Sequence, residues 1–478
     1  MAPAIIRPAL TPTVLPICTI QHDFSAVLAE VRDGLVPEDK FWLSCYKHGQ
    51  PSVHGRVIAH LDERDRDLVR LQGKDGVEII QHIQSAVYSA ACPALEIPHT
   101  RLVLPIASYP DPPSATSRRS HQVTAFDVAP DGSQFATGYH DGSVLLRAIP
   151  IATSPILPYA SAKSHLSTIT SLRFFPSSRV LLSAGADFSL HILPAEPPSS
   201  LNSPQVVVES VRTFRGHTRA VTDTVIISRG RNFLSSSKDA TLRLWDVPSG
   251  SQIRSIALRA PVMKLSIGER PSGAPNGASA PSGTDADIDP REVDTSDKLA
   301  FAALADGSFA AIDLRVKHPI VQSAAAALDA PATSTAALSA IAHAPRDSLL
   351  ATGTVSGEVR IFDIRTVGAE GAHAELAAFR RNSASIEDVS FVSLRAGAYS
   401  HALDGAIPGD ALGLAIATSD GLPYVARLQT AAVDVGVELV GLDCDAVRVI
   451  RTVPGREGGE EIWTAGDDGV VRRYAPRA

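Results

Sequence analysis

The chain has few cysteines, and they are widely spaced. Four cysteines occur among 478 residues, at Cys18, Cys45, Cys92 and Cys444. Disulfide frameworks and zinc ribbons both need closely spaced cysteine pairs, so neither is expected here. The cysteine pattern predicts a reducing compartment. We expect no metal ion and no cofactor.

Long apolar runs and an excess of positive charge are also lacking. No stretch approaches the ~20 apolar residues of a membrane span, and four prolines interrupt residues 1–20 where a signal peptide would carry an apolar core. Lys and Arg number 44 against 51 Asp and Glu, a net charge of −7. Broad phosphate contact needs a basic face, so we expect no nucleic-acid partner. The lack of apolar spans predicts no membrane association, and we expect a monomeric protein.

Amphipathic helices of 10–15 residues are scarce, which argues against a parallel α/β fold. A unit of short strands separated by Gly, Asp and Ser turns recurs instead, most clearly in residues 121–149, 165–193 and 216–247. The turn residues that mark the copies are Asp141, Asp187, Asp239, Asp306, Ser356, Asp420 and Asp468. Their spacing runs from 46 residues (187 − 141) to 67 (306 − 239), which is typical of four-stranded WD repeats with lengthened loops.

This repeat predicts an all-β fold, a seven-bladed WD-repeat β-propeller over residues 111–478. A single unit cannot bury both faces of its sheet, whereas radial stacking buries both and leaves short, protected edges. The seventh unit shows three strands, so we expect residues 101–107 (RLVLPIA) to supply its outer strand.

Two segments fall outside the repeat. Residues 1–110 predict a small β-rich domain, with a short helix over 24–31 and strands over 41–47, 52–61, 67–73 and 77–83. Residues 268–297 are rich in Pro, Gly, Ser and Asp and predict a disordered insertion in blade 4.

One histidine, serine and aspartate are spaced as in a hydrolase: His217, Ser235 and Asp239. The same pattern recurs in other repeats, whereas a catalytic site occurs once, and no G-x-S-x-G elbow surrounds Ser235. We therefore interpret these residues as a structural hydrogen-bond network rather than an active site. Its expected members are His121, Thr137 and Asp141; His165, Ser183 and Asp187; His217, Ser235, Asp239 and Trp245; and Thr464 and Asp468.

Three stretches resemble the proteasomal ATPase-associated factor family: residues 41–55 (FWLSCYKHGQPSVHG), 223–246, and 438–447 with 467–474. The resemblance includes the non-repeat N-terminal segment, while the insertion at 268–297 and the loop at 396–411 depart from it. It implies a non-enzymatic assembly chaperone of the proteasome regulatory particle, found in the cytoplasm and nucleus. Such a protein binds the C-terminal domain of a base AAA-ATPase subunit and is released when the ATPase ring docks on the core particle.

The partner is expected on the face that carries the tight turns, because propeller loops on a rigid scaffold are the usual binding surface. The expected partner-binding residues are Tyr139, His140, Arg219, Lys238, Glu387, Asp388, Asp443, Asp445 and Asp467. The acids of blades 6 and 7 among them predict an acidic patch suited to Lys and Arg of a partner.

A second interpretation concerns two Asp-x-Arg endings, in residues 311–315 (AIDLR) and 361–365 (IFDIR). They resemble in part the W-D-x-R docking box of substrate receptors for cullin-RING ubiquitin ligases, with Ile or Phe in place of Trp. The alternative function is therefore that of a ligase substrate receptor.

Overall fold

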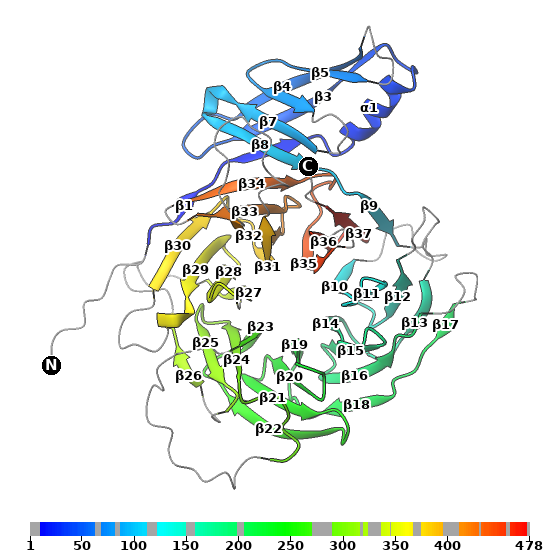
Figure 1. Ribbon diagram of the computed structural model, residues 1–478, viewed down its shortest axis with the longest axis vertical. Helices are drawn as coiled ribbons and strands as arrows, with labels where there is room; N and C mark the ends of the chain where they lie inside the picture. The colour runs from blue at the N-terminus through cyan, green and yellow to red at the C-terminus, as the bar shows by residue number, and fades with distance from the viewer. Residues whose placement is uncertain are drawn as a thin grey trace, which may run out of the picture.

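The computed structural model describes fourteen segments of the chain. They are residues 10–62, 68–81, 87–111, 122–149, 158–197, 205–269, 289–315, 319–323, 336–344, 346–366, 374–394, 411–429, 432–455 and 459–475. Eight sheets form within them, and seven of these each contain a four-stranded antiparallel blade. The seven blades are arranged in a ring, with a smaller unit stacked on one side (Figure 1). The predicted all-β propeller is confirmed.

The blades follow one another around the ring in chain order. Blade 1 consists of β10 (Val123–Val128), β11 (Gln134–Tyr139), β12 (Val144–Ala148) and β13 (Pro158–Ala162). Blade 2 consists of β14 (Ile169–Phe174), β15 (Val180–Gly185), β16 (Ser189–Pro194) and β18 (Arg212–Arg215). Blade 3 consists of β19 (Val221–Ile227), β20 (Asn232–Ser237), β21 (Thr241–Asp246) and β22 (Ser251–Ala257). Blade 4 consists of β23 (Val262–Glu269), β24 (Lys298–Leu304), β25 (Phe309–Asp313) and β26 (Pro319–Gln322).

The second half of the ring repeats this order. Blade 5 consists of β27 (Leu338–Ala344), β28 (Leu349–Thr354), β29 (Glu358–Asp363) and β30 (Ala374–Arg380). Blade 6 consists of β31 (Ile386–Leu394), β32 (Ala411–Thr418), β33 (Tyr424–Leu428) and β34 (Val433–Leu439). Blade 7 consists of β35 (Val447–Pro454), β36 (Glu460–Gly466), β37 (Val470–Tyr474) and β9 (Ala107–Pro110). Short strands extend two blades: β17 (Val206–Val207) lies outside blade 1 and β1 (Thr13–Val14) outside blade 5.

Apolar side chains between neighbouring blades form the core. Leu234, Leu242 and Leu244 of blade 3 pack with Ala300 and Ile312 of blade 4, and all five are at most 1% exposed. The innermost strands of successive blades lie side by side, including β10 and β35, which close the ring. Because each sheet buries both faces against its neighbours, the blades depend on one another for their core.

Acidic residues of the inner strands also join the blades. Asp127 of β10 accepts the backbone N–H of Phe174 in blade 2 at 2.7 Å. Asp223 of β19 accepts that of Leu265 in blade 4 at 3.1 Å, and Asp388 of β31 accepts that of Ile450 in blade 7 at 3.3 Å. Buried charges need such partners, so these acids belong to the framework of the ring.

The outer strand of blade 7 comes from upstream, as the sequence predicts, but it begins only at the last residue of the predicted segment. Strand β9 pairs with β37, whereas residues 101–103 lie in β8 (Ile97–Val103) and pair in parallel with β34 of blade 6. The prediction of residues 101–107 is therefore wrong for 101–103, while its last residue, Ala107, begins β9. Leu102 and Val103 are fully buried between the N-terminal unit and blade 6, whereas an outer strand keeps one side in solvent and carries fewer apolar residues.

The N-terminal unit combines helix α1 (Phe24–Arg32) with two sheets. One sheet contains β2 (Ile17–Ile20), β3 (Glu38–Tyr46), β4 (Val53–Leu61) and β5 (Val69–Gly73). The second contains β6 (Glu78–Gln81), β7 (Val87–Cys92) and β8, with the 3₁₀ turn η1 (Pro93–Leu95) between the last two. Phe24, Leu28 and Val31 of α1 pack with Phe41 in its core, which explains the helix and its apolar spacing.

The N-terminal unit and the propeller share one sheet. Because β8 pairs with β34, strands β6, β7 and β8 continue blade 6 into a seven-stranded sheet. Figure 1 shows this unit directly above blade 6. No helix in the described segments is long and apolar enough to cross a membrane.

Part of the predicted disordered insertion is ordered. Residues 270–288 lie outside the described residues, but 268–269 end strand β23 and 289–297 pack against blade 3. Buried Asn232 of β20 accepts the Val293 N–H at 2.7 Å and donates to the Arg291 carbonyl at 3.1 Å. For 289–297 the prediction is wrong, because a buried amide supplies partners for the backbone of a segment poor in apolar residues.

Candidate partner-binding face and the buried hydrogen-bond chains

Blade 3 contains a continuous chain of four side chains. His217 Nδ1 lies 2.9 Å from Asp239 Oδ2, and His217 Nε2 lies 2.8 Å from Ser235 Oγ. The Trp245 indole N–H donates to the same hydroxyl at 2.8 Å. Strands β20 and β21 bring Ser235 and Trp245 together, while Asp239 sits in the hairpin between them. Asp239 also accepts the Thr218 N–H, so the chain fixes the loop before β19 onto the hairpin.

Burial and hydrogen bonds set the charges in this chain. Burial would raise the pKa of Asp239, but hydrogen bonds from Thr241, the Thr218 N–H and His217 outweigh it and lower the pKa to about 2. Burial lowers the pKa of His217, and Asp239 offsets this only in part. The histidine is therefore neutral and the aspartate ionised at neutral pH.

Blade 2 repeats the chain with a different ending. His165 bonds Asp187 through Nδ1 at 2.9 Å and Ser183 through Nε2 at 3.0 Å. The Trp245 position is taken by Leu193, and His191 of β16 packs edge-on against His165 with ring centroids 4.5 Å apart. Blade 2 thus has two neighbouring imidazoles where blade 3 has one.

Blades 1 and 7 use other partners. His121 lies outside the described residues, and Thr137 instead bonds the Tyr139 hydroxyl at 2.7 Å. Asp141 accepts from Ser143 and pairs with Lys163 at 2.9 Å. In blade 7, Asp468 pairs with Arg472 at 2.5 Å rather than with Thr464.

The arrangement does not suit a hydrolase. Ser235 is completely buried, and its oxygen already contacts both His217 and Trp245. A nucleophile must reach a substrate, with space for the reacting atom about 3 Å away. The His–Ser–Asp spacing instead ties a hairpin to its preceding loop.

The hairpin turns need a left-handed residue after the anchor. Glycine takes this place in blade 1, where Gly142 has φ +85° and an added Cβ would lie 2.3 Å from the His165 carbonyl oxygen. Blades 2 and 3 place Phe188 and Ala240 there, with φ of 69° and 62°. These are the two blades with the His–Asp bond, which holds the strained turn in position.

The tight-turn face is defined here by these hairpins and by the loops that precede each inner strand. Among the predicted binding residues, His140, Arg219, Lys238, Asp443 and Asp445 are exposed on it. His140 lies 3.2 Å from the Thr168 hydroxyl, so it is held in place. These five residues remain candidates for partner contact.

Two predicted binding residues are buried, so the prediction that they lie on the exposed face is wrong. Tyr139 is 3% exposed, and its hydroxyl donates to Asp111 at 2.6 Å. Asp388 is 5% exposed and pairs with Arg451 at 2.5 Å on the inner strand of blade 7. Both are polar residues in strands, which sequence alone does not distinguish from surface residues when their partners are distant in the chain.

Two further predicted acids, Glu387 and Asp467, share one cation. Arg448 pairs with Glu387 at 3.0 Å and with Asp467 at 2.7 Å, across blades 6 and 7. The acidic patch that the sequence predicts is therefore smaller and lies mainly on blade 7.

The remaining acids gather around the loop 443–445, between β34 and β35. Asp443, Cys444 and Asp445 are all exposed, and Cys444 has φ +41°. The pKa of Asp445 is raised, first by partial burial and then by the negative charges of Asp468, Asp443 and Asp467. Arg472 opposes this effect without cancelling it. We call residues 443–445 the acidic loop.

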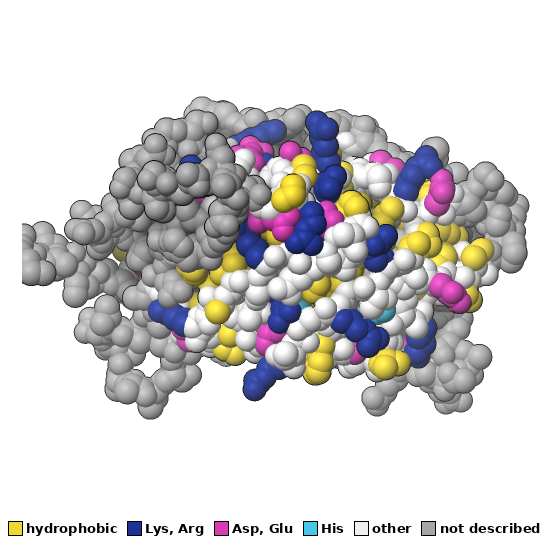
Figure 2. Space-filling model, turned by 90° about the horizontal axis from the view of Figure 1, so that it is seen from below, with side chains coloured by type: hydrophobic (Ala, Val, Ile, Leu, Met, Phe, Trp, Pro, Cys, Tyr) yellow, Lys and Arg dark blue, Asp and Glu magenta, His cyan; other side chains and the backbone are white. Residues whose placement is uncertain are grey.

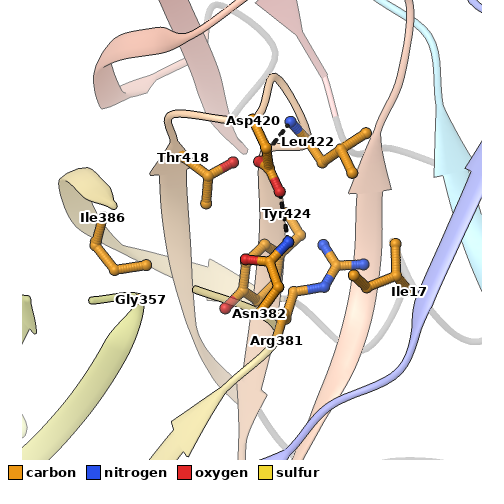
Figure 3. A pocket seen from close by; sticks show the side chains of 9 residues that line it. All are labelled: Ile17, Gly357, Arg381, Asn382, Ile386, Thr418, Asp420, Leu422 and Tyr424. Carbon is orange, nitrogen blue, oxygen red and sulfur yellow. Dashed lines mark hydrogen bonds between the residues drawn. The ribbon is translucent and has the colours of Figure 1, made fainter. Parts of the chain in front are cut away.

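A buried ion pair missed by the sequence analysis lies close to this face. Arg381 and Glu438 are bonded, both at most 8% exposed, and Glu438 also accepts the Cys18 N–H at 3.2 Å. Figure 3 shows Arg381 in a small cavity beside Tyr424, whose ring centroid is 4.2 Å from the guanidinium carbon. A charged residue in an otherwise apolar strand, as in VGVELVGL, is the signal that would have indicated it.

The outer rim of blades 2–4 carries mixed charge. Figure 2 shows Lys and Arg interspersed with Asp, Glu and apolar side chains on that side.

The two Asp-x-Arg endings pair internally: Arg365 bonds Asp363 at 2.6 Å, and Arg315 lies 3.6 Å from Asp313. Each arginine therefore neutralises its own aspartate.

The ring encloses a central channel of about 1150 Å³. Charges of both signs line it, among them Arg173, Asp223, Lys264, Asp388 and Arg451. Arg173 pairs with Asp223 at 3.2 Å and Arg451 pairs with Asp388, so these four charges are paired within the protein.

Comparisons with known proteins agree with the fold. The family "WD domain, G-beta repeat" matches residues 114–146, 158–192 and 208–246. Human Striatin-3 is 33% identical over 100 residues, 20% of this chain and 12% of Striatin-3. WD repeat-containing protein 37 of Pongo abelii is 26% identical over 186 residues, 38% of this chain and 32% of that protein.

Telomerase protein component 1 of Rattus norvegicus is 27% identical over 168 residues, 34% of this chain and 6% of that protein. The chain thus matches only a small part of each of these relatives. The repeat matches and the relatives together support WD-type repeats in this chain.

Proposed function

We propose that this protein is a non-catalytic chaperone for assembly of the 26S proteasome regulatory particle, acting in the cytoplasm and nucleus. It binds the C-terminal domain of a base AAA-ATPase subunit through the tight-turn face. The observation that carries the proposal is the acidic loop, where Asp443 and Asp445 are exposed beside Asp467 and Asp468.

Crowding of negative charge makes this loop a favourable site for a basic partner. Partial burial and then the negative charges of the neighbouring acids raise the pKa of Asp445, which means that its ionised form is destabilised in the free protein. A partner lysine or arginine would relieve that repulsion and speed association through electrostatic attraction.

Release follows from overlap of binding surfaces. If the propeller covers the part of the ATPase that docks on the core particle, binding of the chaperone and of the core exclude each other. No chemistry is needed for this action, which agrees with the burial of the Ser235 hydroxyl.

The test is binding to the isolated C-terminal domains of the base ATPases, followed by surface plasmon resonance at two salt concentrations. The double variant Asp443→Lys/Asp445→Lys is compared with the matched control Glu209→Lys/Asp347→Lys, whose acids are exposed away from the acidic loop. We expect the first variant to lose about tenfold or more in association rate at low salt, and the control to bind as the unmodified protein does.

Two results would reject the proposal. One is no binding to any base ATPase domain. The other is recovery of cullin-ligase subunits, without ATPases, when the tagged protein is purified from extract, which would favour a ligase substrate receptor. Equal binding by both double variants would remove the acidic loop from the interface.

A further inference from the structure

The two buried histidines of blade 2 share their surroundings with an aspartate. His165 lies in the loop before β14, Asp187 in the β15–β16 hairpin and His191 in β16. One donor atom from each, two imidazole nitrogens and a carboxylate oxygen, lie within 4.8 Å of one another. His165 and His191 are 1% and 7% exposed, while the Asp187 side chain is 12% exposed at the tight-turn face.

The Ser189 hydroxyl lies among the three donors. Its Oγ is 3.3 Å from His165 Nδ1, 2.8 Å from Asp187 Oδ1 and 3.0 Å from His191 Nε2. His165 Nδ1 and Asp187 Oδ1 are 2.9 Å apart. Ligands held about 2.0–2.1 Å from a tetrahedral zinc ion lie about 3.3 Å from each other, so this spacing is close to that of a ligand set.

The far nitrogen of each imidazole already has a hydroxyl partner. His165 Nε2 faces Ser183 Oγ at 3.0 Å, and that hydroxyl can donate to the His191 carbonyl oxygen at 3.4 Å. His191 Nδ1 faces Ser210 Oγ at 3.1 Å, and Ser210 donates to the Arg212 carbonyl at 2.8 Å. Metal-bound histidines typically donate their second N–H to such an acceptor, which fixes the ring.

The carboxylate is also oriented from behind. Asp187 Oδ2 accepts the Leu166 N–H at 2.9 Å, which leaves Oδ1 directed at His165 and Ser189. Nitrogen donors favour zinc and similar transition metals over magnesium or calcium.

Blade 3 provides an internal comparison. His217, Asp239 and Thr241 repeat the positions of His165, Asp187 and Ser189, but Arg243 stands four residues after the aspartate, where blade 2 has His191. A cation in this place excludes a metal ion. The second imidazole is thus what distinguishes blade 2.

From these contacts we infer that blade 2 binds a divalent transition-metal ion of the zinc type through His165 Nδ1, Asp187 Oδ1 and His191 Nε2, with Ser189 Oγ or water as fourth ligand. Binding at His165 Nδ1 moves the imidazole proton to Nε2, which then donates to Ser183. This differs from the sequence expectation of no metal, which considered the spacing of cysteines only. The ion would cross-link the loop before β14 to β16.

The experiment is calorimetric titration of metal-stripped protein with zinc chloride, in a Cys444→Ser background that removes the exposed thiol. The test variant is His191→Arg, which reproduces blade 3. The matched control is His54→Arg, an exposed histidine held between the Ser44 and Ser52 hydroxyls. We expect one equivalent of zinc for the parent and the control, and more than 100-fold weaker binding by His191→Arg, beyond the 10–100-fold typical of a lost outer-shell partner.

X-ray absorption of the zinc-loaded parent protein gives a second readout that needs no variant to fold. Two imidazoles and no sulfur in the coordination shell are expected. A sulfur shell, no zinc binding at micromolar concentrations, or unchanged affinity in a folded His191→Arg protein would each overturn the inference.

Discussion

At the scale of single residues, the stability of the blades depends on buried polar atoms that each serve several partners. Ser235 is a clear case, because its one hydroxyl oxygen contacts His217 Nε2 and accepts the Trp245 N–H. Its loss leaves two buried ring nitrogens without their partner. An unpaired buried polar group costs about 1–3 kcal/mol.

We therefore expect Ser235→Ala to lower the free energy of unfolding by about 2–4 kcal/mol, since two ring nitrogens lose a partner. Ser183→Ala in blade 2 should cost less, because Leu193 replaces the tryptophan there. Urea denaturation measures both, with exposed Ser255→Ala of β22 as control. Equal costs at positions 183 and 255 would contradict this account.

The neutral state of His217 predicts a pH dependence. Its pKa is lowered in the folded protein, so below about pH 6.5 the unfolded chain binds more protons than the folded one. Stability should therefore fall as the pH drops from 7 to 5. Below pH 4, protonation of Asp239, whose folded pKa is about 2, should lower it further.

Denaturation at a series of pH values tests this, with His217→Gln as the comparison. The variant should be less stable at pH 7 but lose less on going to pH 5. If the wild-type protein became more stable as the pH fell from 7 to 5, the predicted direction of the pH dependence would be wrong.

Breaking the buried Arg381–Glu438 ion pair should lower the stability of the protein strongly. Glu438→Gln would leave a buried guanidinium without its counter-charge, which typically costs 3–5 kcal/mol. Glu196→Gln, which removes one partner of the exposed pair with Arg179, should change stability little. Thermal unfolding of both variants tests this difference. Similar melting temperatures for the two variants would argue that the buried pair is not formed.

At the scale of elements, local patterns were predictable and distant pairings were not. The Asp-anchored hairpins follow from turn chemistry within a few residues, which is why Asp141, Asp187 and Asp239 all mark real turns. The helix at 24–31 also has a local signal, and α1 spans Phe24–Arg32. No local signal tells that β8 joins blade 6 or β1 joins blade 5, because those parallel partners lie more than 300 residues away.

The candidate site shows the same limit. Exposure of Asp443 and Asp445 agrees with their place in a polar loop, but the burial of Asp388 depends on Arg451 in another blade. The second imidazole at His191 also matters only because the fold brings it beside His165.

Strand β9 also contributes an aromatic side chain where blade 7 meets blade 1, at the closure of the ring. Tyr109 stacks on Trp463 of blade 7 with centroids 5.8 Å apart and contacts Phe135 of blade 1 at 5.4 Å. Tyr109→Ala should lower the free energy of unfolding by about 2–4 kcal/mol. Ser108→Ala, on the exposed side of the same strand, should have little effect in the same urea titration, and equal losses would refute the closing role.

At the scale of the whole molecule, the seven-stranded sheet makes the N-terminal unit and blade 6 mechanically continuous. Val437, Glu438 and Leu439 of β34 are in register with Arg101, Leu102 and Val103 of β8. Elements that share a ladder and a core tend to open together.

Native-state hydrogen exchange should therefore show the amides of β8 and β34 exchanging with similar free energies of opening. Amides of β26, the outermost strand of blade 4, should exchange faster and serve as the reference for local opening. If β8 exchanged as fast as β26, the N-terminal unit would be an independent appendage of the ring.

The pairing of β9 with β37 also has a consequence for synthesis on the ribosome. Pro110 lies opposite Val470, so 360 residues (470 − 110) must be translated before the partner strand exists. At the usual 5–20 residues per second this takes roughly 20–70 s. During that time β9 presents an unpaired edge on the nascent chain, as β8 does until β34 is translated.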